Sequence, residues 1–348
     1  MSEIHGTGLR LLSFDGGGFR GLSSLYILKE IMQRIRRDEG RDDIEPWQCF
    51  DMIGGTSMGG LIAIMLGRLR MPIDDAIDHY TKLTRRVLSR KKHRWQDGTF
   101  KATLLEQATK DIIRKYSESN DEEARLLDKR PDSCKVFVCA MSAANMMASI
   151  PTHFCTFAAY ENVSSDCKIW EAVRATSAHP KFFKRIKIQG IGVRGEYVDG
   201  GIGCNNPTER VLIEANRIFR GAHVACLISI GTGEGEVIKM PESGLKENVV
   251  PLETLKTLIQ IATQCRRTHQ EMAAKFERFK HPGPDPGVYF RFNPDQVPGD
   301  VKQWKELADL GEYTRGYIKL SDNSRHVDAA AAAIRRREPR VLLSEVSR

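Results

Sequence analysis

The sequence predicts an α/β fold in which strands and helices alternate around a mostly parallel sheet. Three observations support this prediction. Apolar runs of strand length recur along the 348 residues and alternate with segments whose apolar residues have helical spacing. The run Val224 to Ile230 is apolar without alternation, which is typical of a parallel strand covered on both faces. Glycine-rich bends follow three of the expected strands. The alternation continues from end to end without a clear domain boundary.

The first half of the chain supplies four expected strands and five expected helices. In the first helix, apolar residues recur at Leu22, Leu25, Leu28 and Met32, which is one face of an α-helix. The polar segments 41–48 and 117–132 are expected to be loops, the second of them exposed. The expected strands are 9–14, 50–53, 135–142 and 154–158, and the expected helices are 22–37, 61–66, 73–90, 102–116 and 170–177.

The second half continues the same pattern. A hairpin is expected over 184–198, and Pro207 suits the first position of the next helix. A polar loop is expected over 234–251. The remaining elements are helices 207–219, 252–279, 301–320 and 329–337 and strands 224–230 and 288–292. We expect residues 7–325 to form the main domain, and 326–348 to form a basic helix or tail that links to further modules in a longer protein.

Composition restricts the class of protein. Eight cysteines are scattered without a C-x-x-C motif, which favours reduced thiols and a cytoplasmic setting. The first ten residues lack the apolar core of a signal peptide, and no apolar run reaches the length of a membrane-spanning helix. The net charge of +8 suits anionic partners such as membrane head groups, nucleic acid or acidic ligands. The basic run from Arg85 to Arg94, beside Trp95, is either a membrane-surface contact or a solvated helix end.

The second glycine bend carries the first candidate catalytic residue. Gly55, Ser57 and Gly59 fit the G-x-S-x-G pattern, and they lie between an expected strand and an expected helix. In this context the serine lies on a sharp strand-to-helix turn, where a Cβ on either glycine would clash. The N-terminus of the following helix favours developing negative charge. An incidental serine in a glycine-rich turn is the alternative.

The first glycine bend, Asp15 to Gly21, has two interpretations. Gly16, Gly18 and Gly21 match the dinucleotide pattern G-x-G-x-x-G, but a Rossmann fold needs an acidic residue at the end of the next strand. Asp38 and Glu39 stand at about the right distance, but they end a charged helix. The same geometry suits an oxyanion hole, with donors at Gly16, Gly17, Gly18 and Met58. Arg20 either holds this bend, favours an anionic substrate, or is a plain surface arginine.

The third bend, Asp199-Gly200-Gly201, supplies a carboxylate. Because the carboxyl ends of parallel strands meet at one edge of a sheet, we expect Asp199 to reach Ser57 and to act as its general base. A Ser–His–Asp triad would need a histidine in a turn after a later strand. None of the later histidines stands in such a place, so a dyad is favoured; they are His223, His269, His281 and His326.

No metal or cofactor is expected. The sequence has no H-E-x-x-H motif, no EF-hand loop and no zinc-type spacing of cysteine and histidine. Asp15 and Asp199 could be taken for a metal-binding or glycosidase pair. We instead expect Asp15 to accept hydrogen bonds that shape the first bend.

Together the three bends resemble the patatin-like phospholipases. Residues 175–178, 205–207 and 229–233 are also similar to segments of that family, so the resemblance runs from about Leu9 to at least Gly233. One departure is His179, which stands before Pro180 where the family often has a small residue, and this leaves acyl-chain specificity open. The segments that carry the resemblance are Asp15-Gly16-Gly17-Gly18-Phe19-Arg20-Gly21, Gly55-Thr56-Ser57-Met58-Gly59-Gly60 and Asp199-Gly200-Gly201.

The resemblance implies a three-layer α/β/α fold, a Ser57–Asp199 dyad and calcium-independent hydrolysis of acyl esters in phospholipids or other lipids. We therefore expect a serine-dependent hydrolase that acts on phospholipid at a membrane surface, as a cytoplasmic protein with peripheral membrane association. We expect no nucleic acid partner, and a homo-oligomer stays open. A lipid transacylase, or a lipid-binding or signalling module with a vestigial site, are the alternatives.

Overall fold

A computed structural model describes residues 6–89, 99–144, 150–158, 167–190, 193–233, 252–279, 287–294 and 306–347. Within them the strands form one mixed sheet in the order β5-β6-β3-β2-β1-β7-β8, with β4 paired to β3 and β9 to β7. The strands are β1 (Leu9–Phe14), β2 (Met52–Thr56), β3 (Lys135–Ser142), β4 (Thr152–Cys155), β5 (Ile186–Gly190), β6 (Val193–Asp199), β7 (His223–Ile230), β8 (Tyr289–Phe292) and β9 (Val341–Leu342).

The centre of the sheet is parallel. Strands β3, β2, β1, β7 and β8 pair in parallel, whereas β4, β5, β6 and β9 join in antiparallel fashion. The register aligns Phe14 with Gly55 and Thr56 with Cys139. The carboxyl ends of β1, β2 and β3 therefore lie side by side, which is where ligand sites form in parallel sheets.

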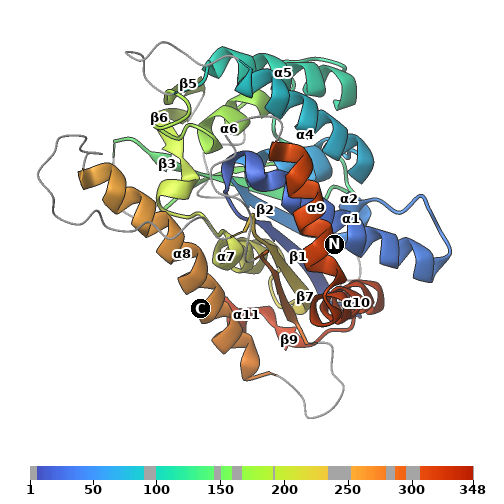
Figure 1. Ribbon diagram of the computed structural model, residues 1–348. Helices are drawn as coiled ribbons and strands as arrows, with labels where there is room; N and C mark the ends of the chain where they lie inside the picture. Colours follow the sequence, from blue (N-terminus) through green and yellow to red (C-terminus); the bar gives the residue numbers. More distant parts are fainter. Residues whose placement is uncertain are drawn as a thin grey trace, which may run out of the picture.

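Helices cover both faces of the sheet (Figure 1). On one face α1 contacts α4, α9 and α10, and α3 packs on β2; on the other face α7 packs on β1 and contacts α8 and α11. The helices are α1 (Gly21–Glu39), α2 (Pro46–Cys49), α3 (Met58–Ala63), α4 (Ile73–Leu88), α5 (Ala102–Tyr116), α6 (Ile169–Thr176), α7 (Thr208–Ile218), α8 (Leu252–Glu277), α9 (Glu306–Lys319), α10 (Ser321–Arg336) and α11 (Leu343–Val346). The predicted three-layer α/β/α fold is confirmed.

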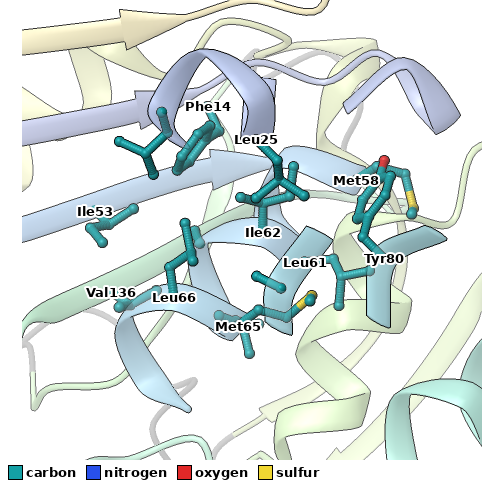
Figure 2. Close-up of a cluster of buried hydrophobic side chains, with 14 of the residues drawn as sticks. Phe14, Leu25, Ile53, Met58, Leu61, Ile62, Met65, Leu66, Tyr80 and Val136 are labelled. Carbon is teal, nitrogen blue, oxygen red and sulfur yellow. The ribbon is translucent and has the colours of Figure 1, made fainter. Parts of the chain in front are cut away.

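The residue alternation of β1 explains the two layers. Leu12 and Phe14 belong to the larger apolar core, under α1 and α3, whereas Leu9 and Leu11 belong to the second core, under α7. Successive side chains of a strand point to opposite faces, so a strand covered on both faces contributes to both cores. Figure 2 shows part of the larger core, where Phe14 and Ile53 face Leu66 from the segment that follows Ser57.

Two expected loops contain more structure than their polarity suggested. The segment 41–48 includes the start of α2, whose first residue is Pro46. In 117–132, the side chains of Leu126 and Asp128 are buried, although we expected an exposed loop. Arg68 accounts for this, because its guanidinium donates to the backbone carbonyls of Leu126 at 2.9 Å and Arg125 at 3.0 Å.

The last part of the chain differs from the expected tail. The helix predicted at 329–337 begins at Ser321, so α10 spans the expected boundary between 325 and 326. Val327, Ala330 and Ile334 of this helix are buried in the larger core, and Val341 pairs with Val224 of β7. Residues 326–347 therefore pack on the same sheet as the rest of the chain.

Some expectations fall outside the described residues. These are the polar loop over 234–251, the basic residues 90–94 with Trp95, and the start of the helix predicted from 301. Among the helices that the structure describes, none combines the length and the apolar character that crossing a lipid bilayer requires.

Candidate active site

Ser57 occupies the bend between β2 and α3 and has a strained backbone. Its φ of 55° and ψ of −128° lie in a region that residues with a side chain rarely adopt, at a typical cost of about 1–3 kcal/mol. Its amide donates to Oγ1 of Thr176 at 2.8 Å, and the same hydroxyl donates to the carbonyl of Cys139 at 2.6 Å. The end of α6 thus fixes the serine against β3, and this support from Thr176 was not anticipated from the sequence.

The two glycines around Ser57 permit close backbone approach. A Cβ on Gly55 would lie 2.4 Å from the carbonyl oxygen of Gly59, and a Cβ on Gly59 would lie 2.4 Å from the carbonyl oxygen of Asp15. Neither contact is sterically acceptable, so both positions need glycine. The second contact also shows that the first bend packs directly against the first turn of α3.

Asp199 lies against Ser57, although the two residues are 142 positions apart in the chain. The Ser57 hydroxyl donates to Oδ2 of Asp199 at 2.6 Å, and the amide of Gly201 donates to Oδ1 at 2.7 Å. Asp199 is 1% exposed and Ser57 is 9% exposed. Burial raises the pKa of Asp199 from 3.8 to about 7, because the two hydrogen bonds offset only part of the desolvation. The carboxyl group is therefore able to exchange a proton near neutral pH.

The route of Asp199 to the site corrects the expectation from parallel strands. It ends β6, which runs antiparallel to β3, so the rule for carboxyl ends of parallel strands does not place it. Instead β6 pairs only with the last residues of β3, where Asp199 stands opposite Ala140. The residue before Ala140 is Cys139, which pairs with Thr56 at the end of β2 and so brings Asp199 close to Ser57. Gly200 fits there because a Cβ would lie 2.2 Å from the carbonyl oxygen of Cys139.

The first bend presents some of its amides to the site but not all. The amide of Gly16 donates to the carbonyl of Asn205 at 2.9 Å, so the expected donor at Gly16 is engaged elsewhere. Gly17 and Gly18 are partly exposed. Within the described part of the chain, the amides of Gly17, Gly18 and Met58 have no hydrogen-bond acceptor. Met58 is the first residue of α3, whose N-terminal amides are unpaired by helix geometry.

The remaining motif residues support the bends. Gly21 begins α1, where a Cβ would meet the hydroxyl of Tyr80 at 2.5 Å, and Arg20 ends the short 3₁₀ turn η1 (Gly18–Arg20). The Tyr80 hydroxyl donates to the carbonyl of Gly18 at 3.0 Å. Gly200 and Gly201 form the short 3₁₀ turn η5 (Gly200–Ile202) directly after Asp199.

Asp15 makes an ion pair that the sequence did not reveal. Its two carboxylate oxygens accept from the guanidinium of Arg291 on β8, at 2.9 and 2.5 Å. Asp15 does accept hydrogen bonds, as expected, but they come from a strand 276 positions later. Only the alternation of β8 hints at this arginine, because Phe290 and Phe292 on either side of it are buried.

The later histidines have other surroundings. His223 is exposed at the start of β7, and His269 contacts the Tyr289 hydroxyl at 3.1 Å. His326 packs against Phe290 and Phe292 with the ring planes tilted, and His281 lies outside the described residues. Earlier in the chain, His153 pairs with the buried Glu214 at 2.8 Å. In the described chain, the hydrogen-bond donors to Asp199 are Ser57 and Gly201. The same residues contain no group of three or more metal-ligating side chains.

Sequence comparison identifies the family. The family model described as patatin-like phospholipase matches residues 12–212, which is more than half of the chain and includes all three bends. This chain belongs to the patatin-like phospholipase family. The resemblance inferred from the three bends is thereby confirmed.

Individual relatives of the family are distant. Calcium-independent phospholipase A2-gamma of Homo sapiens is 28% identical over 92% of this chain and 40% of its own length. Patatin-like phospholipase 1 of Plasmodium falciparum is 27% identical over 84% of this chain and 44% of its own length. An Arabidopsis thaliana protein named probable inactive patatin-like protein 9 is 25% identical over 69% of this chain and 64% of its own. The chain thus spans less than half the length of the first two relatives.

Proposed function

We propose that this protein is a lipid acyl hydrolase in which Ser57 is the nucleophile and Asp199 the general base. The observation that carries the proposal is the 2.6 Å hydrogen bond from the Ser57 hydroxyl to a buried carboxylate that no cation of the described residues neutralises. A base acts best when its pKa lies near the working pH, and the pKa of Asp199 is about 7. The strained backbone of Ser57 holds the hydroxyl toward this base.

The proposed reaction has two steps. Ser57 Oγ attacks the carbonyl carbon of a fatty-acyl ester while its proton passes to Asp199 Oδ2. The tetrahedral intermediate then collapses, the alcohol of the lipid leaves with the proton from Asp199, and an acyl-enzyme remains. In the second step Asp199 takes a proton from water, the hydroxide attacks the acyl carbon, and the fatty acid is released as Ser57 recovers its proton.

The oxyanion of the intermediate would be held by backbone amides. We assign this role to Gly17, Gly18 and Met58, since the amide of Gly16 already donates to Asn205. Removal of one such donor typically lowers a rate by about 10²–10³. The first bend packs on the first turn of α3, so these amides come from adjacent backbone.

The substrate class follows from the relatives and the charge. Two of the relatives carry phospholipase in their names, so we propose phospholipids as substrates and a lipid surface as the place of reaction. The net charge of +8 would favour a surface with anionic head groups. One relative is named as probable inactive, but the Ser57–Asp199 hydrogen bond in this chain favours an enzyme over a binding module.

The test compares Ser57→Ala with Ser133→Ala. The two serines are both 9% exposed, but Ser133 lies before β3, at the opposite end of that strand from the site. Each protein is incubated with mixed phospholipid vesicles in EGTA, and the products are read by mass spectrometry. We expect Ser57→Ala to lower fatty-acid release by about 10³ or more, while Ser133→Ala retains it.

A fluorophosphonate probe supplies an independent measurement. It should label the wild type and Ser133→Ala at Ser57, and it should leave Ser57→Ala unlabelled. Equal fatty-acid release by wild type and Ser57→Ala would remove Ser57 from the reaction. An added lysolipid acceptor separates hydrolysis from transacylation, because transfer would appear as a new diacyl product.

A further inference from the structure

Arg291 and Asp15 form a buried, bidentate ion pair beside the first bend. The side chain of Arg291 is 9% exposed and that of Asp15 is 2% exposed. The two hydrogen bonds, at 2.9 and 2.5 Å, are of the charge-assisted, parallel kind that fixes geometry most strongly. Asp15 directly precedes Gly16, and its backbone amide donates to the carbonyl of Ile230 at 3.0 Å. Arg291 therefore fixes the residue from which the first bend begins.

The same guanidinium reaches the other support of the bend. Arg291 Nη1 donates to Oγ of Ser229 at 2.8 Å, and this hydroxyl contacts Oγ1 of Thr208 at 2.8 Å. Thr208 in turn donates to Oδ1 of Asn206 at 2.5 Å, next to Asn205. The carbonyl of Asn205 is the group that accepts the amide of Gly16. Gly16 is thus fixed on one side by Asp15 and on the other by Asn205, and both are connected to Arg291 by hydrogen bonds or adjacent backbone.

Close packing extends this support to Gly17. A Cβ on Gly231 would lie 2.6 Å from Arg291 Nη2, so the bend after β7 lies directly against the guanidinium. The next residue, Thr232, occupies the space that a Cβ on Gly17 would need, because such a Cβ would lie 1.8 Å from Thr232 Oγ1. Thr232 also contacts the carbonyl of Gly16 through Oγ1 at 3.4 Å. Movement of the guanidinium would therefore displace Gly17 through this packing.

We propose that Arg291 is a positioning residue for the oxyanion hole, which acts chiefly through Asp15, with Ser229 as a second contact, to hold the amides of Gly17 and Gly18 toward Ser57. The inference rests on the proposed function of the same site. Arg291 is buried behind the bend and bonded to protein groups, so it acts on the bend and not on the substrate. Its strand, β8, lies beyond the residues that the family model matches.

The opposing interpretation is a purely structural ion pair. Removal of one partner from a buried pair is strongly destabilising wherever the pair lies, so loss of stability does not separate the two interpretations. Arg34 of α1, whose ion-pair partner Asp328 is 57% exposed, supplies a control of equal side-chain exposure. Its side chain is also 9% exposed and binds Asp328 at 2.9 Å and Ser324 Oγ at 3.1 Å. It lies 13 residues after Gly21, the first residue of α1, which places it about 20 Å from the first bend at the α-helical rise per residue.

The experiment compares Arg291→Lys with Arg34→Lys in the full chain, at a temperature where both are folded by circular dichroism. Lysine keeps the charge but loses the bidentate geometry. We expect Arg291→Lys to lower kcat by about 10- to 100-fold, because small misplacement of catalytic groups has effects of this size, with KM within about threefold. Arg34→Lys should retain kcat within about twofold, even if its melting temperature falls as far as that of Arg291→Lys.

A trifluoromethyl ketone probes the oxyanion hole directly. Ser57 Oγ adds to its carbonyl carbon, the serine proton passes to Asp199, and the ketone oxygen becomes an oxyanion. The inhibition constant should weaken in Arg291→Lys by about the factor lost in kcat/KM, and it should be unchanged in Arg34→Lys. Wild-type kcat and wild-type inhibition in folded Arg291→Lys would overturn the proposal.

A double-mutant cycle tests the route through Asp15. If Arg291 acts through this carboxylate, Arg291→Lys should lower kcat by no more than about threefold in an Asp15→Asn background. Loss factors that multiply independently would contradict the inference. If Arg291→Lys does not fold, the double variant Asp15→Asn with Arg291→Gln, in which both groups are neutral, replaces it. An unchanged kcat in that double variant also overturns the inference.

The proposed function and the inference fail in different ways. If wild type releases no fatty acid and Ser57 is not labelled, the proposed function itself has failed. If only the Arg291 variants behave as wild type, the inference alone has failed.

Discussion

The bends at Asp15 and Asp199 each contain a buried aspartate followed by glycine, but the two carboxylates have different partners. Asp15 accepts two hydrogen bonds from the Arg291 guanidinium, whereas Asp199 accepts one from the Ser57 hydroxyl and one from the Gly201 amide. Both side chains are almost inaccessible to water, at 2% and 1% exposure. The difference between them is therefore the presence of a cation and not the depth of burial.

The partner decides what each carboxylate can do. Burial raises the pKa of Asp15 above its ordinary value, although Arg291 opposes the rise; in return Asp15 raises the pKa of Arg291 above its ordinary value, against the effect of burial. The two groups stabilise each other as ions and hold a fixed geometry. Among the described residues Asp199 has only neutral hydrogen-bond partners, so no charged group there opposes burial, and its pKa is about 7. One aspartate is suited to anchor a bend, and the other is suited to exchange protons.

The largest effect that would test this contrast is expected from Asp199→Asn. An amide cannot accept the Ser57 proton, so fatty-acid release should fall by about 10³. The free energy of unfolding at pH 8 should nevertheless rise. Because the native pKa is raised from 3.8 to about 7, the native state binds the proton more tightly, and wild-type stability falls as pH rises between these values, by roughly 4 kcal/mol. Asparagine does not titrate and avoids that loss.

Asp128→Asn is the control for this prediction. Asp128 is also buried, but Arg130 donates to it at 2.6 Å and holds its pKa below the ordinary value, against the opposing effect of burial. We expect Asp128→Asn to keep its activity and to lose stability at pH 8. Urea unfolding and fatty-acid release measure both quantities. An Asp199→Asn protein that is active, or that is destabilised like Asp128→Asn, would contradict the assigned contrast.

The next effect in size is the pH dependence of the wild-type rate. The unprotonated Asp199 is the proposed base, so kcat/KM for an uncharged, water-soluble ester should rise about tenfold per pH unit up to about 7 and then level off. Between pH 5 and pH 8 the rise should be about 100-fold. A rate that is constant over this range would show that Asp199 is ionised throughout, as a carboxylate paired with a cation would be.

Part of this site was predictable because the requirements are local. Gly55 and Gly59 bracket Ser57 within five residues, and the steric demand at Gly55 is local because its Cβ would meet the carbonyl oxygen of Gly59, whereas the demand at Gly59 comes from Asp15. The strands before the first two bends were predicted from apolar runs, which depend only on burial of both faces of the sheet, and the strand before the third bend was predicted as part of a hairpin over 184–198. The Ser57–Asp199 contact was expected too, although the reason given, the carboxyl ends of parallel strands, does not apply to β6.

The unpredicted part depends on partners far away in the chain. Arg291 lies in a four-residue strand, and alternation shows that it faces away from Phe290 and Phe292 without showing that Asp15 is on that side. The engagement of the Gly16 amide depends on the carbonyl of Asn205, and a sequence carries no signal for a single backbone hydrogen bond. The helix start at Ser321 was missed because α10 opens with six polar residues before Val327.

The smallest effect is expected at Thr176, which holds Ser57 beside Asp199 and touches neither carboxylate. Thr176→Val keeps the shape but removes the acceptor for the Ser57 amide and the donor to Cys139. Two buried backbone groups lose a partner, so we expect the free energy of unfolding to fall by about 1–3 kcal/mol and kcat by about tenfold.

Thr176→Ser retains the hydroxyl and should stay within about threefold of the wild-type rate, so the pair separates the hydrogen bonds from the loss of a methyl group. Fatty-acid release and urea unfolding are measured on both variants. If Thr176→Val is as active as Thr176→Ser, then the bond to Asp199 and the packing of Gly59 on the first bend are sufficient to orient Ser57. In that case the contrast between the two aspartates alone, without the support from α6, would account for the reactivity of the site.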